Sequence, residues 1–306
     1  MTSSLNEKLP DTVLPSKHVT NIVSGPEKVS LSKIIRRITT LLVGNDKVAQ
    51  PTHVEPSTNL KFEREMGIHS SDFKSQIPVV VPCFNNPTYT ARMLKQLSGL
   101  GFQNVMLFDN ASTSPEMLTW LTHVENLVKI VRLCKNEGPR YPALDPLSLA
   151  FLPRRFCVTD PDLDFNDRLP TDFLTEMAQL AETFKVGKVG FALDISDRKK
   201  MKTESFRIGS KLWKIWEWES QFWEKKIGQT SYGDDVFDAD VDTTFALYDK
   251  KYYSPEKFMG ALRVAGCFTA RHLPWYRSVG MPKSEIELYR NTQKFSFYLG
   301  NENPPK

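Results

Sequence analysis

Short apolar runs alternate with amphipathic stretches from residue 77 onward. The β-branched run at residues 77–86 (IPVVVPCFNN) ends in turn residues and predicts a strand, and residues 87–100 after it predict a helix. The same order recurs, with strands predicted at 104–108, 127–133, 155–159 and 189–193 and helices at 115–124 and 171–184. Alternating strands and helices are typical of an α/β fold with a mainly parallel sheet flanked by helices.

In a sheet of this kind, ligands bind beyond the carboxyl ends of the strands. The loops that follow the first three predicted strands lie at residues 82–86, 109–114 and 136–140. We therefore expect these loops to converge on one crevice, which is the candidate nucleotide site.

Residues 1–76 differ from the rest of the chain because they are rich in Ser, Thr, Pro, Asn and Lys. We interpret them as a mobile extension with one short amphipathic helix at residues 31–43. That helix docks either on the chain's own domain, which is the favoured alternative, or on a membrane. The domain itself is predicted for residues 77–300.

Residues 210–227 (SKLWKIWEWESQFWEKKI) predict a long helix that carries four of the six tryptophans. Helical spacing places Trp213, Trp216 and Trp223 on one face, packed on the sheet, and Trp218 elsewhere. The alternative is that one or two of these indoles stack on an acceptor sugar or lie among lipid headgroups.

The net charge of +4 comes from 40 basic and 36 acidic residues interspersed along most of the chain, which argues against a nucleic-acid-binding protein. The four cysteines form no CxxC pair, which indicates a reducing compartment. No apolar run reaches the roughly 20 residues of a membrane span. We therefore expect a cytoplasmic protein, with contact to a membrane surface left open.

Three carboxylates give the strongest chemical signal, because Asp160, Asp162 and Asp164 alternate directly after the strand predicted at 155–159. Carboxylates this close repel one another unless a cation neutralises them, and Mg²⁺ prefers carboxylate and phosphate oxygens. An isolated Asp-x-Asp is more often a solvated loop or a helix cap. Its position after a fourth strand, behind three candidate ligand loops, favours a metal site.

Four segments together resemble the amino-terminal half of family 2 glycosyltransferases, which have the GT-A fold of nucleotide-diphospho-sugar transferases. They are IPVVVPCFNNPTYTARMLKQL, FDNASTSP, NEGPR and VTDPDLDF, and their order and spacing carry the resemblance. The resemblance covers residues 77–165, the expected nucleotide-binding half of the domain, and residues 166–300 would form the acceptor-binding half. The later segment ARHLPWY resembles a closing motif in one branch of these enzymes.

The resemblance implies roles for individual residues. Those that would bind the nucleotide are Pro82, Phe84, Asn85, Asp109, Asn136, Arg140 and Asp160. Among them, Asp109 would accept a hydrogen bond from the base, and Arg140 would pair with phosphate through its planar guanidinium group.

The resemblance also implies Mn²⁺ or Mg²⁺ as the cofactor, held by Asp160, Asp162 and His272. Asp164 would either support that site or cap the turn after the strand. The two arginines near His272, Arg263 and Arg271, would neutralise the leaving diphosphate or be solvated surface charges.

Inversion at the sugar requires a base that takes the proton of the acceptor hydroxyl. The candidates are Asp234, Asp235, Asp238, Asp240 and Asp242. We favour Asp242 because the apolar stretch TTFALY after it would fix its backbone, whereas the earlier aspartates resemble a flexible loop. The chain departs from the family in lacking a clear Glu-Asp with a spaced Arg, and the missing QxxRW argues against a processive synthase.

The sequence therefore predicts a metal-dependent inverting glycosyltransferase of the hexosyltransferase class. It would move a sugar from a nucleotide-sugar donor, with a UDP-sugar favoured, to a glycan or glycolipid acceptor in polysaccharide biosynthesis. One alternative is a catalytically inactive nucleotide-sugar-binding scaffold of a glycan assembly complex. A sugar nucleotidyltransferase ranks lower, because it would normally show a Gly-rich loop and a Lys after the first strand.

Overall fold

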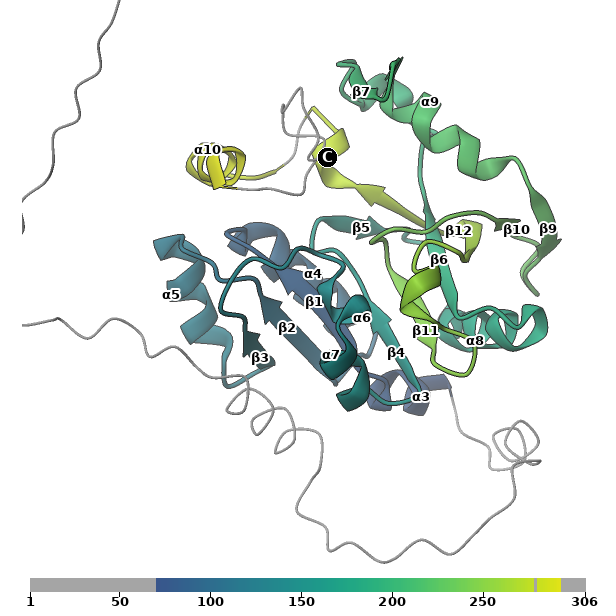
Figure 1. Ribbon diagram of the computed structural model, residues 1–306, viewed down its shortest axis with the longest axis horizontal. Coiled ribbons are helices and arrows are strands. Elements are labelled where there is room, and N and C mark those ends of the chain that lie inside the picture. The colour runs from purple at the N-terminus through teal and green to yellow at the C-terminus, as the bar shows by residue number, and fades with distance from the viewer. Residues whose placement is uncertain (1–69, 278–279, 293–306) are drawn as a thin grey trace, which may run out of the picture.

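A computed structural model describes residues 70–277 and 280–292 (Figure 1). The amphipathic helix predicted at residues 31–43 lies outside these residues. The α-helices are α3 (Ser70–Gln76), α4 (Pro87–Gly99), α5 (Pro115–Val124), α6 (Tyr141–Leu144), α7 (Pro146–Phe151), α8 (Phe173–Phe184), α9 (Ile215–Ser220) and α10 (Lys283–Thr292). Short 3-10 helices are η1 (Arg198–Lys200), η2 (Gln221–Trp223), η3 (Pro255–Lys257) and η4 (Leu273–Trp275).

The strands form one large sheet and one hairpin. The sheet contains β1 (Val79–Cys83), β2 (Val105–Asp109), β3 (Lys129–Arg132), β4 (Arg155–Val158), β5 (Leu163–Phe165), β6 (Lys188–Leu193), β9 (Lys226–Gln229), β10 (Asp235–Asp238), β11 (Ala246–Asp249) and β12 (Leu262–His272). The hairpin consists of β7 (Phe206–Ile208) and β8 (Lys211–Trp213).

The strand order of the sheet is β3-β2-β1-β4-β11-β6-β12-β10-β9, and β5 pairs with β12. Neighbours from β3 to β4 are parallel, as are β6 and β12, whereas β11, β10 and β5 run in the opposite direction. The expected mainly parallel sheet with flanking helices is thus confirmed. The antiparallel strand β11 enters between β4 and β6, which the sequence pattern did not predict.

Helices cover both faces of the sheet because its central strands are apolar on both faces. The first two strands are buried along their whole length. One face carries Val79, Val81 and Leu107, which pack in one core cluster with residues of α4, α5 and α8. The other face carries Val80 and Met106, in a second cluster under α6 and α7. Strands buried on both faces are characteristic of parallel sheets.

Side chains at the ends of the strands fix where the helices begin. The side chain of Asn86 accepts a hydrogen bond from the backbone N–H of Tyr89, and Ser114 does the same for Met117. In both helices a proline occupies the first turn, where a missing N–H costs nothing. The loops after β1 and β2 are therefore short and well defined.

The long helix predicted at residues 210–227 is wrong. This stretch contains β8, α9, η2 and β9, because Gly209 with φ +60° turns the chain back from β7. Lys214 is extended, and its backbone N–H donates to the carboxylate of Glu217, which starts a new helix after the hairpin. Local turn and cap signals thus outweigh the helical spacing of the tryptophans.

The prediction that Trp213, Trp216 and Trp223 share one helix face fails for the same reason. Trp213 lies on β8 and contacts Trp218 edge to face, with ring centroids 5.4 Å apart. Trp223 packs on Phe237 of β10 instead. Two of the four aspartates before Asp242 also differ from the expected flexible loop, since Asp235 and Asp238 lie on strand β10.

Helix α3 precedes residue 77 and packs on the domain. Phe73 contacts the main core cluster, and the ammonium of Lys74 lies over the ring of Phe173. Of the described helices, none is both long and apolar enough to cross a membrane.

Candidate active site

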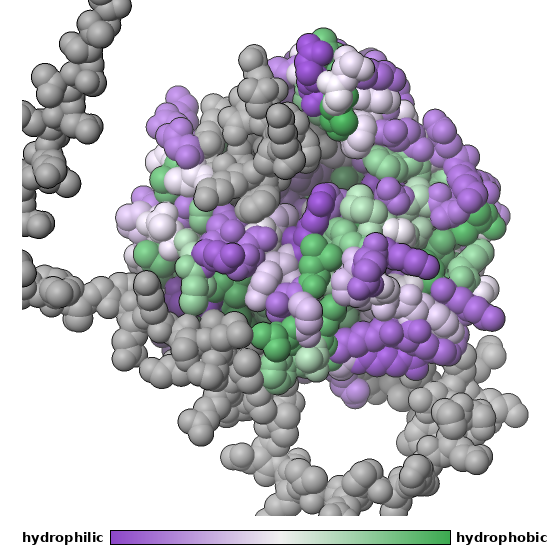
Figure 2. Space-filling view, in the orientation of Figure 1, coloured by the Kyte–Doolittle hydropathy of each residue, from purple (hydrophilic) through white to green (hydrophobic). Residues whose placement is uncertain are grey.

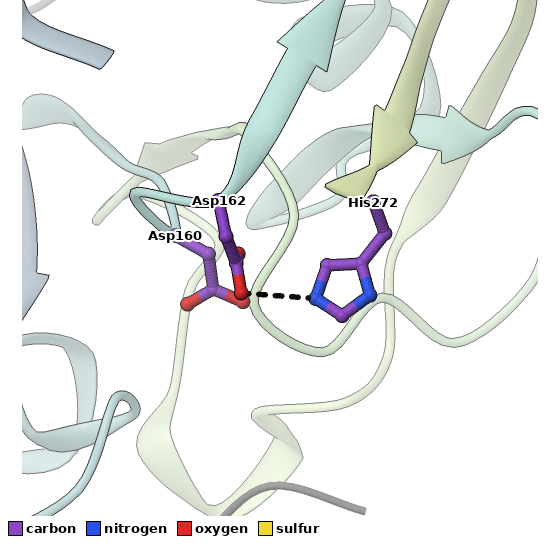
Figure 3. A group of neighbouring side chains, drawn as sticks. All are labelled: Asp160, Asp162 and His272. Atoms are coloured by element: carbon purple, nitrogen blue, oxygen red, sulfur yellow. Dashed lines mark ion pairs between the residues drawn. The ribbon is translucent and has the colours of Figure 1, made fainter. Parts of the chain in front are cut away.

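Three predicted ligands come together at the carboxyl end of β4. Asp160 follows β4, Asp162 immediately precedes β5, and His272 is the last residue of β12 (Figure 3). The antiparallel pairing of β5 with β12 sets Leu163 opposite His272 and so brings the two segments together. One ligand atom from each residue lies within 4.8 Å of the others, and His272 Nε2 is 3.3 Å from Asp162 Oδ2.

The electrostatics of this cluster fit a divalent cation. Burial of the carboxyl group and the neighbouring charge of Asp162 raise the pKa of Asp160 well above its usual range. Thr243 Oγ1 donates to Asp160 Oδ2 at 2.5 Å, whereas Asp162 Oδ1 is buried with no hydrogen-bond partner among the described residues. Two carboxylates and an imidazole are ligands that Mn²⁺ and Mg²⁺ accept, and a bound ion would satisfy the buried oxygen.

Arg140 and Asp242 form a bidentate ion pair beside the cluster of Asp160, Asp162 and His272. Arg140 Nε donates to Asp242 Oδ1 at 2.7 Å and its second nitrogen to Oδ2 at 2.6 Å. Both side chains are nearly half exposed, and both interact electrostatically with Asp160. The predicted phosphate-binding residue and the predicted base thus form an ion pair with each other.

Lys188, on β6, fixes the backbone at Asp242. Its fully buried ammonium donates to the backbone carbonyls of Val241 (2.6 Å), Asp242 (2.9 Å) and Phe258 (3.1 Å). Close packing of β6 on Val241 also holds this backbone in place. A Cβ on Gly190 would come within 2.7 Å of Val241 Cγ1, so only glycine fits there without a shift of Val241. The position of Asp242 therefore depends on β6 as well as on the TTFALY stretch that follows it.

Three of the four other predicted base candidates have side-chain partners elsewhere. Asp235 pairs with Lys226 and Asp238 with Lys225, both along the β9–β10 edge of the sheet. Asp234 accepts a hydrogen bond from the backbone N–H of Cys267. Among the five aspartates, Asp242 is the one whose charge acts on Asp160.

Two predicted nucleotide-binding residues are engaged by neighbouring loops. Asn85, with φ +49°, accepts hydrogen bonds at Oδ1 from the backbone N–H groups of Thr113 (2.7 Å) and Ser114 (2.8 Å). Asp109 Oδ1 accepts one from Ser112 N at 3.1 Å. Asn85 thus ties the loop after β1 to the loop after β2, whereas Asp109 shapes the loop that directly follows its own strand.

The remaining predicted nucleotide-binding residues differ in access. Pro82 lies inside β1 and is buried, whereas Phe84 is partly exposed just beyond the strand. Asn136 Oδ1 accepts from Gly138 N at 3.0 Å and shapes the turn before Arg140. Of this set, Phe84 and Arg140 present the most surface to a ligand.

Helix α10 packs against the loop after β1 and the first turn of α4, and the sequence patterns did not predict this helix. Glu285 accepts hydrogen bonds from the hydroxyl (2.6 Å) and backbone N–H (3.3 Å) of Thr88, in the first turn of α4. At its other end, Thr292 Oγ1 accepts from Asn85 Nδ2 at 3.2 Å. The carboxyl end of β1 therefore meets a helix from the far end of the chain.

Two charged residues have roles that differ from those considered. Arg263 is almost fully buried and pairs with the equally buried Glu219, so it is neither a surface charge nor a ligand for diphosphate. Asp164 pairs with Arg92 of α4 at 2.8 Å and is not one of the three side chains that meet in the candidate metal cluster. Arg271 remains exposed at the end of β12.

Neither the family models nor the curated proteins compared with this chain match it. Solved structures similar to it include TarS of S. aureus, at 15% identity over 70% of this chain and 38% of that one, with a TM-score of 0.38. GalNAc-T7 with UDP, GalNAc and Mn²⁺ has 13% identity over 72% of this chain and 49% of that one, with a TM-score of 0.40.

HddC from Yersinia pseudotuberculosis is similar at 10% identity over 71% of this chain and all of that one, with a TM-score of 0.38. The chain spans less than two thirds of the length of the TarS structures it matches. Because these TM-scores lie below 0.5, the case for a function depends on the side chains of the site.

Proposed function

We propose that this chain is a metal-dependent inverting glycosyltransferase of the GT-A fold and of the family 2 type. The observation that carries the proposal is the meeting of Asp160, Asp162 and His272 at the carboxyl end of β4, where Asp162 Oδ1 is buried without a hydrogen-bond partner among the residues that the structure describes. The donor is a nucleotide sugar, with a UDP-sugar favoured, and the acceptor is a glycan or glycolipid.

Asp162 and His272 would hold Mn²⁺ or Mg²⁺, helped by Asp160. When bound, a divalent ion supplies positive charge to the diphosphate leaving group. Thr243 fixes the carboxylate of Asp160 through its 2.5 Å hydrogen bond to Oδ2. The nucleotide would lie over Phe84 and the loops that Asn85, Asp109 and Asn136 organise.

In the proposed reaction, Arg140 binds the donor phosphate and Asp242 acts as the base. A donor phosphate competes for the guanidinium group of Arg140, since both anions suit its planar geometry. Once released, Asp242 accepts the proton of the acceptor hydroxyl while the new bond from that oxygen to the anomeric carbon forms and the bond to the diphosphate breaks. The nucleoside diphosphate leaves with the electron pair of the broken bond.

The same pair also favours a second candidate, the catalytically inactive nucleotide-sugar-binding scaffold. A carboxylate that remains bonded to an arginine is a weak base, because the pairing stabilises its charged form. The two candidates differ in transfer, not in donor binding. Measuring both on one protein therefore separates them.

Donor binding is tested by thermal shift of the purified chain with UDP-, GDP-, CMP- and dTDP-sugars, each with Mn²⁺ and with chelator. We expect stabilisation by one nucleotide, and only with metal, because ligand that binds the folded state raises the melting temperature. Transfer or hydrolysis of that donor would support the enzyme. Binding without any turnover would support the scaffold, and no shift with any donor would contradict both.

Metal binding is tested by Asp162→Asn, which replaces one carboxylate oxygen with an amide. We expect Mn²⁺ affinity, measured by titration calorimetry, to fall at least about tenfold, because a neutral amide is a poorer ligand for a hard cation. The matched control is Asp164→Asn, two residues away and paired with Arg92. Equal Mn²⁺ affinity in both variants would rule out the proposed ligand.

A further inference from the structure

Residues 198–214, here called the basic segment, differ in charge from the rest of the chain. Of the 40 lysines and arginines, seven lie in this segment, against one of the 36 acidic residues, Glu204. The seven are Arg198, Lys199, Lys200, Lys202, Arg207, Lys211 and Lys214. The rest of the chain is therefore slightly acidic, and the positive charge is concentrated in one place.

The hairpin of the basic segment has an inner aromatic face and an outer face. Phe206 pairs with Trp213 in register, and both rings contact Trp218 of α9, at centroid distances of 6.2 and 5.4 Å. Arg207 pairs with Leu212. Because side chains alternate along a strand, Arg207 and Leu212 lie on the face away from α9. Leu212 is 55% exposed.

Arg207 lies opposite this leucine in the hairpin, and Lys211 precedes it in sequence with its ammonium over the Trp213 ring. Arg198, Lys199, Arg207 and Lys211 are exposed, and none of them pairs with a carboxylate among the residues that the structure describes. By contrast, Lys200 pairs with Asp197 at 3.7 Å. Figure 2 shows strongly hydrophilic and hydrophobic residues mixed at the end of the molecule that carries β7.

The combination of charge and exposed apolar surface distinguishes the possible partners. A nucleic acid or a soluble acidic glycan would neutralise the cations but would leave Leu212 in water. An anionic bilayer surface satisfies both, since its lipid phosphates attract nearby lysines and arginines and apolar side chains enter the headgroup layer.

We propose that the basic segment docks the chain on an anionic phospholipid membrane, with Leu212 entering the headgroup layer and the exposed cations of the segment pairing with lipid phosphates. The segment is fixed to the wall of the candidate site: Met201 bridges to Tyr276, and Lys202 N donates to the carbonyl of Trp275 at 2.8 Å. Both contacts lie just after His272, so a docked membrane lies beside that site. The proposal does not depend on the reaction.

The test is co-sedimentation of the full chain with vesicles of phosphatidylcholine alone or mixed with phosphatidylglycerol. We expect binding to the anionic vesicles only, weakened by added salt. The double variant Arg207→Glu/Lys211→Glu should bind them at least about tenfold more weakly, and Leu212→Asn several-fold more weakly. Circular dichroism checks that these exposed substitutions leave the fold intact.

Matched substitutions outside the basic segment serve as controls. Lys95 and Lys185 are exposed, and Leu127 is 80% exposed, so Lys95→Glu/Lys185→Glu and Leu127→Asn should leave vesicle binding unchanged. Equal weakening by the controls would show a non-specific charge effect and overturn the proposal. So would full vesicle binding by the hairpin variants, or absence of binding by the unaltered chain.

A soluble polyanion distinguishes the remaining partner. If heparin binds the unaltered chain but not the Arg207→Glu/Lys211→Glu variant, while anionic vesicles bind neither, the basic segment recognises an acidic polymer and the membrane proposal is wrong. Binding of the unaltered chain to anionic vesicles, weakened in both Arg207→Glu/Lys211→Glu and Leu212→Asn, is the result that the proposal requires.

Discussion

Lys188 joins two segments of the chain through three backbone carbonyls, at residues 241, 242 and 258. Burial lowers its pKa to about 7, against the opposing charge of Asp242. Further charges that act on it are those of Arg140, Arg263 and Asp240, and its ammonium also lies over the rings of Phe258 and Tyr248. At the scale of single residues, this side chain determines where Asp242 lies.

Lys188→Met should lower the free energy of unfolding by about 2–4 kcal/mol, because three buried carbonyls lose their donor. Urea unfolding followed by circular dichroism measures it. The matched control is Lys250→Met, since Lys250 also donates to two carbonyls, of Leu149 and Leu152, but is less buried. Hydrogen exchange over residues 240–244 should rise in the first variant and not in the second.

The pH dependence of stability follows from the same residue. Between a folded pKa of about 7 and the ordinary value of 10.5, the unfolded state binds more protons at Lys188 than the folded state does. The free energy of unfolding should therefore rise with pH across this window, and Lys188→Met should lack that rise. An identical pH profile in both proteins would contradict the pKa shift.

Helix α10 packs beside the candidate nucleotide site, through contacts at both of its ends. Its Glu285 carboxylate lies at the amino terminus of α4, where the backbone N–H groups favour an anion. Thr292 holds its other end on Asn85. A nucleotide over the loop after β1 would therefore have α10 as a neighbour.

Thr88→Val removes the hydroxyl that donates to Glu285 at 2.6 Å while keeping the shape of the side chain. We expect faster amide exchange across residues 283–292, by several-fold, because α10 loses its charge-assisted hydrogen bond. Mass spectrometry of exchanged peptides measures this. Thr122→Val, which loses an exposed bond within α5, is the control, and equal exchange in both variants would contradict the contact.

At the scale of the whole molecule, the end of the sheet opposite the candidate site is held by a buried carboxylate. Asp249 accepts hydrogen bonds from Arg154 (2.9 Å) and Arg155 (2.8 Å) and is fully buried. Burial raises its pKa, but these hydrogen bonds outweigh that effect and hold the pKa below its usual range. The pair of arginines joins β4 to the end of β11.

Asp249→Asn should cost about 2–3 kcal/mol of unfolding free energy at neutral pH, less than for a fully buried pair because the arginines are partly exposed. The stabilisation by Asp249 should be lost as pH falls below 3.8, its ordinary pKa, so the two proteins should converge in acid. Asp238→Asn, in an exposed pair with Lys225, should cost less than about 1 kcal/mol. Urea unfolding at several pH values measures all three proteins.

The first half of the fold and the candidate metal ligands could be predicted from the amino-acid sequence. Alternation of β-branched runs with capped amphipathic stretches predicted β1 to β4, α4, α5 and α8, because strand and helix periods and caps are local properties. The spacing of the aspartates after β4 also predicted Asp160 and Asp162 as ligands. The resemblance to family 2 glycosyltransferases added His272 to them. The family 2 assignment and the site roles stay predictions.

Tertiary structure alone decided the features that depend on distant pairing. Three such features join segments far apart in the chain. They are the insertion of β11 between β4 and β6, the buried Arg263–Glu219 pair and the hydrogen bond between Glu285 of α10 and Thr88. Local patterns carry no information on such pairing, since it follows from how whole elements bury their surfaces together. The same holds for the pairing of Arg140 with Asp242, which puts the predicted base and the predicted phosphate ligand in one ion pair.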